Sequence, residues 1–169
     1  MLRTRLAKSY IKRTFRVLYG WTQMTPKSNF LDPAWDRSVD IYPGMVMTKG
    51  VGDLVTLIGA AGHVPYGFAA LYVGGDGIDE PADVGINAFS TWVLAPDAEA
   101  EVLAPAFDDG STWTDGGSTE VLVHAIVDGV RRGKLAPAGQ TGRGTLSTAP
   151  IARLIKVNSA SKLTIGGLR

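Results

Sequence analysis

IYPGMVMTKG, residues 41–50, joins a firm turn to the first clear strand pattern of the chain. Proline fixes φ near −65°, so Pro43 suits the second position of a β-turn. Gly44 suits the third position of a type II turn, where φ is positive. An alternating apolar stretch follows directly. The pattern predicts a turn at which a compact β domain begins.

Short apolar or alternating runs continue from this turn toward the end of the chain, and most of them end at Gly, Pro or Asp. Such runs are typical of strands bounded by turns. About seven of them within roughly 120 residues predict a mainly β fold, either a small barrel or a sandwich. The predicted strand runs are residues 46–50, 53–59, 66–75, 89–96, 100–105, 119–129 and 151–157.

The start of the chain has a different pattern. Residues 4–19 carry apolar residues at helical spacing, with basic residues over much of the remaining surface. This predicts a short basic helix that begins near Thr4 and ends near Gly20. Such a helix would pack on its own domain or dock on an acidic partner, and the composition also resembles a transit peptide. The apolar stripe consists of Ala7, Ile11, Phe15 and Leu18.

Residues 20–40 show no clear period, and Pro26 and Pro33 break any helix. Large aromatic side chains at irregular spacing fit an extended segment that places single anchors in the pockets of a partner. They fit equally well a loop that crosses its own core. We therefore expect a basic arm over residues 1–40 and an all-β domain over residues 41–169. The aromatic residues concerned are Trp21, Phe30 and Trp35.

Charge is segregated along the chain, although the net charge is only +1. Residues 1–31 hold seven basic residues and no acid, whereas residues 32–130 hold all sixteen acids and only two basic residues. Residues 131–169 hold eight basic residues and no acid. Segregated charge of this kind concerns partners and orientation rather than fold.

Reactive chemistry is sparse. The chain has no Cys, so disulfides and thiolate metal sites are excluded. His63 and His124 are far apart, no HExxH or GxSxG motif occurs, and the paired acids lie in turn-rich segments. Alternation places His124 on one face of a strand, which favours a hydrogen-bonded core histidine. We expect no catalytic site, no metal site, no cofactor and, without a long apolar run, no membrane span.

Several segments resemble head decoration (cement) proteins of tailed bacteriophages. These segments are IYPGMVMTKGVGDLVTLIG at 41–59, GVRRGKLAPAG at 129–139, APIARLIKV at 149–157 and SKLTIGGL at 161–168. They are similar to the family's opening Pro-Gly element, its G-x-L-x-P turn, its return strand and its closing strand. The chain departs from the family pattern in its long basic arm and in the segment GGDGIDEPADVG at 74–85.

The resemblance implies a structural virion protein that binds the outer surface of the capsid and bridges neighbouring major capsid subunits. It also implies homo-oligomers, with trimers favoured, a location on the capsid surface, and a stage in the host cytoplasm during assembly. The domain-entry turn would be Pro43 and Gly44. The arm residues assigned to capsid binding are Arg3, Arg5, Lys8, Lys12, Arg13, Arg16, Trp21, Phe30 and Trp35.

Three other readings stay open at this point. The basic arm would also suit a nucleic-acid-binding domain, although the acidic middle of the chain argues against it. A tail or connector component of the virion would also use the basic arm. An enzyme with an unrecognised site in a β-barrel is the third reading.

Overall fold

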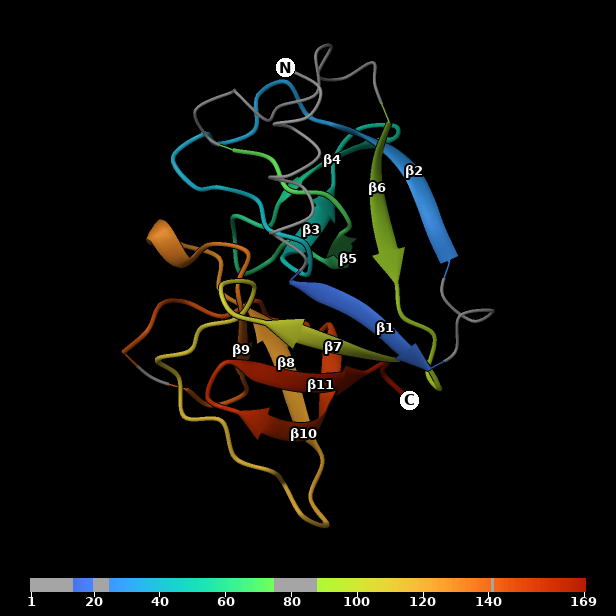
Figure 1. Ribbon diagram of the computed structural model, residues 1–169. Coiled ribbons are helices and arrows are strands. Elements are labelled where there is room, and N and C mark those ends of the chain that lie inside the picture. Colours follow the sequence, from blue (N-terminus) through green and yellow to red (C-terminus); the bar gives the residue numbers. More distant parts are fainter. Residues whose placement is uncertain (1–13, 20–24, 75–87, 141) are drawn as a thin grey trace, which may run out of the picture.

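The computed structural model describes residues 14–19, 25–74, 88–140 and 142–169. In these ranges the regular elements are strands, apart from one short 3-10 helix, which confirms the predicted mainly β fold (Figure 1). The elements are β1 (Phe15–Tyr19), β2 (Thr25–Leu31), β3 (Val46–Lys49), β4 (Leu54–Leu57), β5 (Pro65–Ala69), β6 (Ala88–Val93), β7 (Glu99–Leu103), β8 (Val121–Ala125), the 3-10 helix η2 (Gly129–Arg131), β9 (Leu135–Pro137), β10 (Ala152–Ser159) and β11 (Lys162–Gly166).

The strands form a closed barrel and a six-stranded sheet. The barrel has the order β2-β4-β3-β5-β6, and the sheet has the order β1-β7-β11-β10-β8-β9. Figure 1 shows the barrel in the upper part of the view and the sheet below it. The chain therefore starts in the sheet, builds the barrel, and returns to the sheet.

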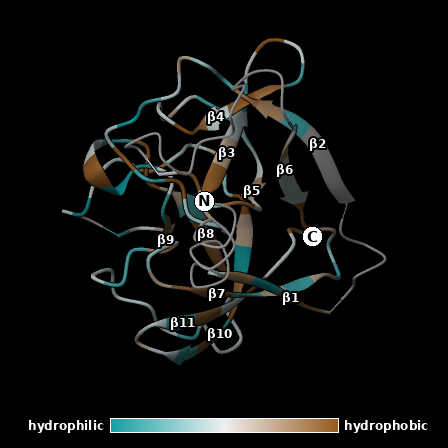
Figure 2. Ribbon diagram, turned by 45° about the horizontal axis from the view of Figure 1, so that its top comes forward, coloured by the Kyte–Doolittle hydropathy of each residue, from teal (hydrophilic) through white to brown (hydrophobic). Residues whose placement is uncertain are grey.

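Each of the seven predicted strand runs overlaps an observed strand of the barrel or the sheet. The alternation that predicted them also explains their burial. In β7, for example, Ala100 and Val102 are buried while Glu99 and Glu101 are partly exposed. Figure 2 shows hydrophobic stretches along strands of both the barrel and the sheet.

The predicted basic helix over residues 4–19 is wrong where the structure describes it, because Phe15–Tyr19 is strand β1. β1 pairs antiparallel with β7, with Phe15 opposite Val102 and Arg16 opposite Glu101. The segment FRVLY begins with alternating apolar and polar residues, so it fits a strand as well as a helix. Pairing with the distant strand β7 makes it a strand. Residues 1–13, the rest of the predicted helix, lie outside the described residues.

The described part of residues 1–40 belongs to the folded body. β2 pairs antiparallel with β6 along its whole length except Leu31, and it pairs with β4 only at Phe30 and Leu31. Pro26 is tolerated because proline is compatible with a strand whose second edge is open. The loop after β2 then buries Trp35 and Val39 in the core.

One hydrophobic core serves both the barrel and the sheet. The buried cluster combines barrel residues such as Met47 and Phe68 with sheet residues such as Val102, Val123 and Leu163. Burial of apolar side chains contributes about 25 cal/mol per Å² of area removed from water, so this shared cluster is the main source of stability. The barrel and the sheet therefore stabilise one another.

The Pro43–Gly44 turn lies where the barrel meets the sheet. The Met45 N–H donates to the Tyr42 carbonyl at 3.0 Å, and Gly44 has φ of 95°, as a type II turn requires. A Cβ atom on Gly44 would lie 3.1 Å from the Phe15 ring of β1 and 3.2 Å from Ala106. The Thr14 hydroxyl donates to the Pro43 carbonyl. The turn thus holds the start of β1 against the barrel.

We predict that Gly44→Ala lowers the melting temperature measured by circular dichroism. A side chain at positive φ costs about 1–2 kcal/mol, and here it would also press on Phe15 and Ala106. Gly52→Ala is the matched control, because Gly52 has φ of 64° but nothing within 4 Å of the added Cβ. Equal losses for the two variants would show that the turn does not pack tightly at the junction.

Candidate interaction surface

The structure describes some of the residues that the sequence assigned to capsid binding. Arg16 is in β1, and its side chain is 68% exposed and forms a 3.2 Å ion pair with Glu101. Phe30 is in β2 and is partly buried. Trp35 is only 3% exposed and belongs to the core cluster. The other assigned residues, which lie outside the described ranges, are Arg3, Arg5, Lys8, Lys12, Arg13 and Trp21.

Trp35 is thus a core residue, so its indole is not available as an exposed anchor. The Arg37 guanidinium lies over its ring at 5.4 Å from the centroid. Of the two readings that the sequence left open for this aromatic, the position of Trp35 fits a loop that crosses its own core. Hydrophobicity and spacing alone do not distinguish an interface anchor from a core residue.

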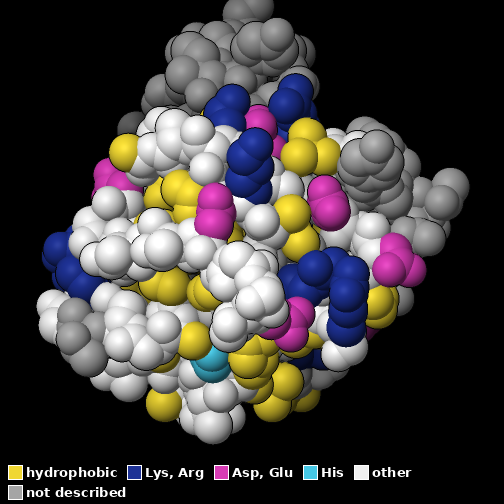
Figure 3. All heavy atoms as spheres, turned by 90° about the horizontal axis from the view of Figure 1, so that it is seen from below, with side chains coloured by type: hydrophobic (Ala, Val, Ile, Leu, Met, Phe, Trp, Pro, Cys, Tyr) yellow, Lys and Arg dark blue, Asp and Glu magenta, His cyan; other side chains and the backbone are white. Residues whose placement is uncertain are grey.

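The segregated charges of the sequence meet one another in the fold. Basic residues of the last forty positions form ion pairs with acids of the middle segment, and so does Arg16 of β1. Figure 3 shows basic and acidic side chains interspersed on one face. The ion pairs from the last segment are Arg131–Asp108, Arg132–Asp36, Arg143–Asp108, Arg153–Glu120 and Lys162–Glu101.

The described body is consequently balanced in charge. Of the 17 Lys and Arg residues, five lie in residues 1–13, and of the 16 acidic residues, four lie in residues 75–87, so the described part holds twelve of each. Residues 1–13 contain no acid, which gives this segment a formal charge of +5 from its side chains. The excess positive charge of the sequence is therefore concentrated immediately before β1.

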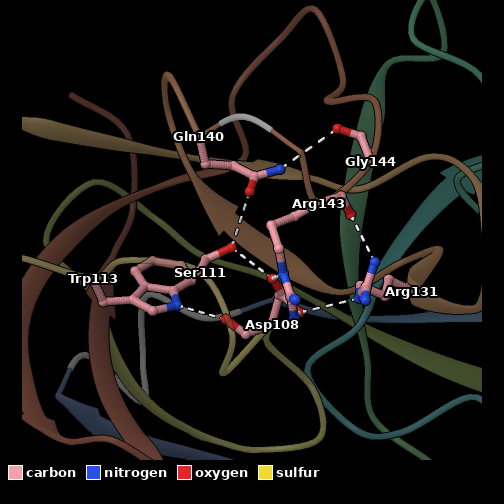
Figure 4. Close-up of polar contacts among 7 residues, drawn as sticks. All are labelled: Asp108, Ser111, Trp113, Arg131, Gln140, Arg143 and Gly144. Carbon is pink, nitrogen blue, oxygen red and sulfur yellow. Dashed lines mark hydrogen bonds and ion pairs between the residues drawn. The ribbon is translucent and has the colours of Figure 1, made fainter.

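The most buried charge of the described residues is Asp108, whose side chain is 2% exposed (Figure 4). Arg143 donates to both of its carboxylate oxygens, Nε to Oδ2 at 2.9 Å and Nη2 to Oδ1 at 2.8 Å. The Ser111 hydroxyl donates to Oδ2 at 2.6 Å, and Arg131 Nε lies 3.5 Å from Oδ1. The Trp113 indole donates to the Asp108 carbonyl at 2.8 Å. Asp108 therefore ties its own loop to η2 and to the loop that carries Arg143.

Hydrogen bonding from Arg143 is the largest cause that holds the pKa of Asp108 below its usual value, while burial acts in the opposite direction. Because the folded-state pKa is lowered, the carboxylate stabilises the fold at pH values above the unfolded-state pKa. That contribution is lost as the pH falls through the folded-state pKa. The carboxylate has all these partners within the fold, so the network ties together the segments that carry them.

The sequence offered a weak signal for this network. Arg143 stands between two glycines, and Asp108 and Ser111 lie in a turn-rich loop. A Cβ on Gly110 would overlap the Arg143 guanidinium, so the glycine allows the close approach of the two loops. The sequence did not reveal that these loops meet, because 35 residues separate Asp108 from Arg143.

A mainly apolar groove of about 740 Å³ lies between β1 and the barrel. Its walls come from β1 and β7 of the sheet, from β6 of the barrel, and from the segment after β5. Leu71 is exposed at its rim, and Tyr72 and Trp92 are partly buried in its walls. The lining also includes Phe15, Arg16, Val17, Pro43, Ala70, Glu101 and Leu103.

The described residues contain no group of three or more His, Cys, Asp or Glu side chains that would hold a metal ion. His124 is partly buried, and its Nδ1 donates to the Ser147 carbonyl at 2.8 Å. In the described ranges there is also no helix long and apolar enough to span a membrane.

We predict that Asp108→Asn lowers the free energy of unfolding at neutral pH by about 2–3 kcal/mol, because Arg131 and Arg143 lose their shared carboxylate. The difference from the unaltered protein should shrink below pH of about 4, where Asp108 becomes protonated in the unfolded chain and then in the fold. Denaturant titrations across pH measure this. Asp109→Asn, at an exposed neighbouring position, should change stability by less than about 0.5 kcal/mol. Equal effects of the two variants would contradict the assignment.

Trp35→Ala should lower the free energy of unfolding of the free protein by about 3–5 kcal/mol, the usual cost of removing a buried tryptophan. Thermal unfolding of the isolated protein measures it. An unchanged melting temperature, combined with weaker capsid binding, would instead support an interface role for Trp35.

Comparison with known proteins bears on the resemblance noted in the sequence. The profile of the family described as phage cement protein matches residues 1–169. No curated protein and no solved structure gives a significant match. Because the family match spans the full length, the chain belongs to the phage cement protein family.

Proposed function

We propose that this protein binds the outer surface of a phage capsid and stabilises it by bridging neighbouring major capsid subunits. Membership of the cement protein family gives a structural, capsid-associated role and a location in the virion. The bridging itself is supported by the arrangement of charge in this chain. The proposed role requires binding alone, so we expect no catalytic activity and no cofactor.

The observation that carries the proposal is the contrast between the body and the start of the chain. The described body has equal numbers of acidic and basic residues, whereas residues 1–13 have five basic residues and no acid. A neutral body gives little general attraction, while a +5 segment is drawn to an acidic surface. We propose that residues 1–13 reach one capsid subunit while the body rests on its neighbour. The basic residues concerned are Arg3, Arg5, Lys8, Lys12 and Arg13.

Stabilisation would follow from mass action. A ligand that binds only the assembled shell shifts the equilibrium toward that shell by an amount that grows with its occupancy. Copies on one lattice act together, so a modest affinity of each copy gives a large total effect. Because the chain has no Cys, these contacts are non-covalent. We further propose a homo-oligomer on the shell, with a trimer favoured, that attaches during assembly in the host cytoplasm.

Nucleic-acid binding is the second candidate, because residues 1–13 would also attract phosphates. The balanced charge of the described body argues against it, since domains that bind nucleic acid usually carry an excess of basic residues. A salt titration of binding to DNA and to empty shells separates the two. Tighter binding to DNA than to shells at the same ionic strength would favour the second candidate.

Removal of residues 1–13 should weaken binding to empty shells about tenfold or more at 0.1 M salt, while the melting temperature stays the same because β1 and the rest of the sheet are retained. Binding is measured by co-sedimentation with shells assembled from the major capsid protein of the same phage. The gap between the two proteins should narrow at 1 M salt, where the screening length falls to about 3 Å.

A matched pair of variants separates the position of the charge from its amount. Arg3, Arg5 and Lys8 are replaced by Gln in one variant, and Lys134, Lys156 and Arg169 are replaced by Gln in the other. Both lose three positive charges. Equal loss of shell binding would show that net charge matters and that the N-terminal segment has no special role.

Particles that lack this protein should assemble but release their DNA at lower temperature than decorated ones. Release is followed with a dye that cannot enter an intact shell, for bare, partly decorated and fully decorated particles. Adding the purified protein should restore the release temperature in a saturable way. Three superimposable curves would refute the stabilising role and leave display or host adhesion as the better account.

A further inference from the structure

We infer that the groove beside β1 binds an extended segment of the capsid subunit that carries apolar side chains and carboxylates. This inference rests on the proposed capsid-binding function and names the surface and the chemistry of the contact. Three independent features of the groove support it.

The first feature is an open strand edge. β1 is the first strand in the order of the six-stranded sheet, and among the described residues only β7 pairs with it. The unpaired N–H and C=O groups of an edge strand bind another extended chain readily. A segment that enters the groove would therefore form backbone hydrogen bonds along β1.

The second feature is the apolar lining. Leu71 lines the groove and is 39% exposed. Val17, Tyr72 and Trp92 line the walls and are partly exposed. Aromatic and aliphatic side chains in a pocket are the usual centre of an interface. Side chains of alternate residues in an extended segment would point into this lining.

The third feature is the charge at the β1 side of the groove. Glu101 lines the groove and pairs with two cations, Arg16 at 3.2 Å and Lys162 at 3.5 Å. Arg16 and Glu101 line the groove and Lys162 lies beyond it, so the cluster of these three residues, rather than the lining itself, has one positive charge in excess. In the sequence, residues 1–13 with their five basic residues come directly before this side of the groove. On the far wall the Tyr72 hydroxyl donates to Asp40 at 3.0 Å. Carboxylates of the bound segment would lie toward β1, and a basic segment, such as residues 1–13 of a second copy, would be repelled there.

The main test places a charge in the apolar lining. Leu71→Asp should weaken binding to empty shells at least tenfold, because a carboxylate would be buried among Trp92, Tyr72 and the bound apolar side chains. The melting temperature should stay the same, because Leu71 is exposed in the free protein. Val130→Asp and Val51→Asp are matched controls, since these valines are 77% and 88% exposed on η2 and on the turn between β3 and β4. Both controls should bind like the unaltered protein.

A second measurement needs no variant. Hydrogen exchange of the unaltered protein, free and bound to empty shells, should show added protection at β1 amides that point away from β7. Absence of added protection there would overturn the inference, as would full binding by Leu71→Asp.

Three further outcomes locate a failure. If the unaltered protein binds shells but Val130→Asp loses binding while Leu71→Asp does not, the capsid contact lies at η2 and the groove assignment is wrong. If Leu71→Asp changes the oligomeric state of the free protein in sedimentation velocity, the groove is a contact between copies, which also overturns the inference. If the unaltered protein does not bind shells at all, the proposed function fails together with the inference.

Discussion

Close packing at Gly44 is the constraint on which the arrangement of the barrel and the sheet depends. The Gly44 N–H bonds to the Ala69 carbonyl of β5, and two residues later the Val46 N–H bonds to the Gly133 carbonyl beyond η2. A Cβ on Gly44 would lie 3.1 Å from the ring of Phe15 in β1, and that ring stacks on Phe68 of β5 at 5.2 Å between ring centroids. Because Gly44 has no side chain, β1 can lie close to the turn, and the apolar faces of the barrel and the sheet form one core.

Strands that are marked by a local sequence pattern could be predicted from the sequence. Strands that form because they pair with a distant segment could not. All seven predicted runs, from residue 46 to residue 157, overlap strands because turn residues bound them. β1 was mistaken for the end of a helix because FRVLY fits both periods, and its partner β7 is more than eighty residues away in sequence. β2 was missed because residues 20–40 show no clear period, and β9 spans only Leu135–Pro137, too short for a periodic signal.

The interaction surface was less predictable than the fold because it is assembled from distant segments. The groove takes its lining from β1, β6, β7 and the segment after β5, and none of these shows a recognisable motif. The charge blocks of the sequence suggested a partner, but Arg132 meets Asp36 across 96 positions and Arg143 meets Asp108 across 35. Ion pairs within the fold thus neutralise much of the charge that is segregated along the sequence. The predicted charged attachment stays a prediction, and residues 1–13, where the sequence contains no acid, hold most of the basic residues assigned to it.

With a neutral body and a basic segment, binding would depend on two kinds of interaction: long-range electrostatic attraction and short-range apolar burial. In the proposed attachment, long-range attraction would act mainly on residues 1–13, so it would set the association rate and decide which side of the molecule meets the shell first. That segment leads directly into β1, so the encounter would bring the groove to the surface of the capsid. Apolar burial acts only over short distances and would mainly slow dissociation.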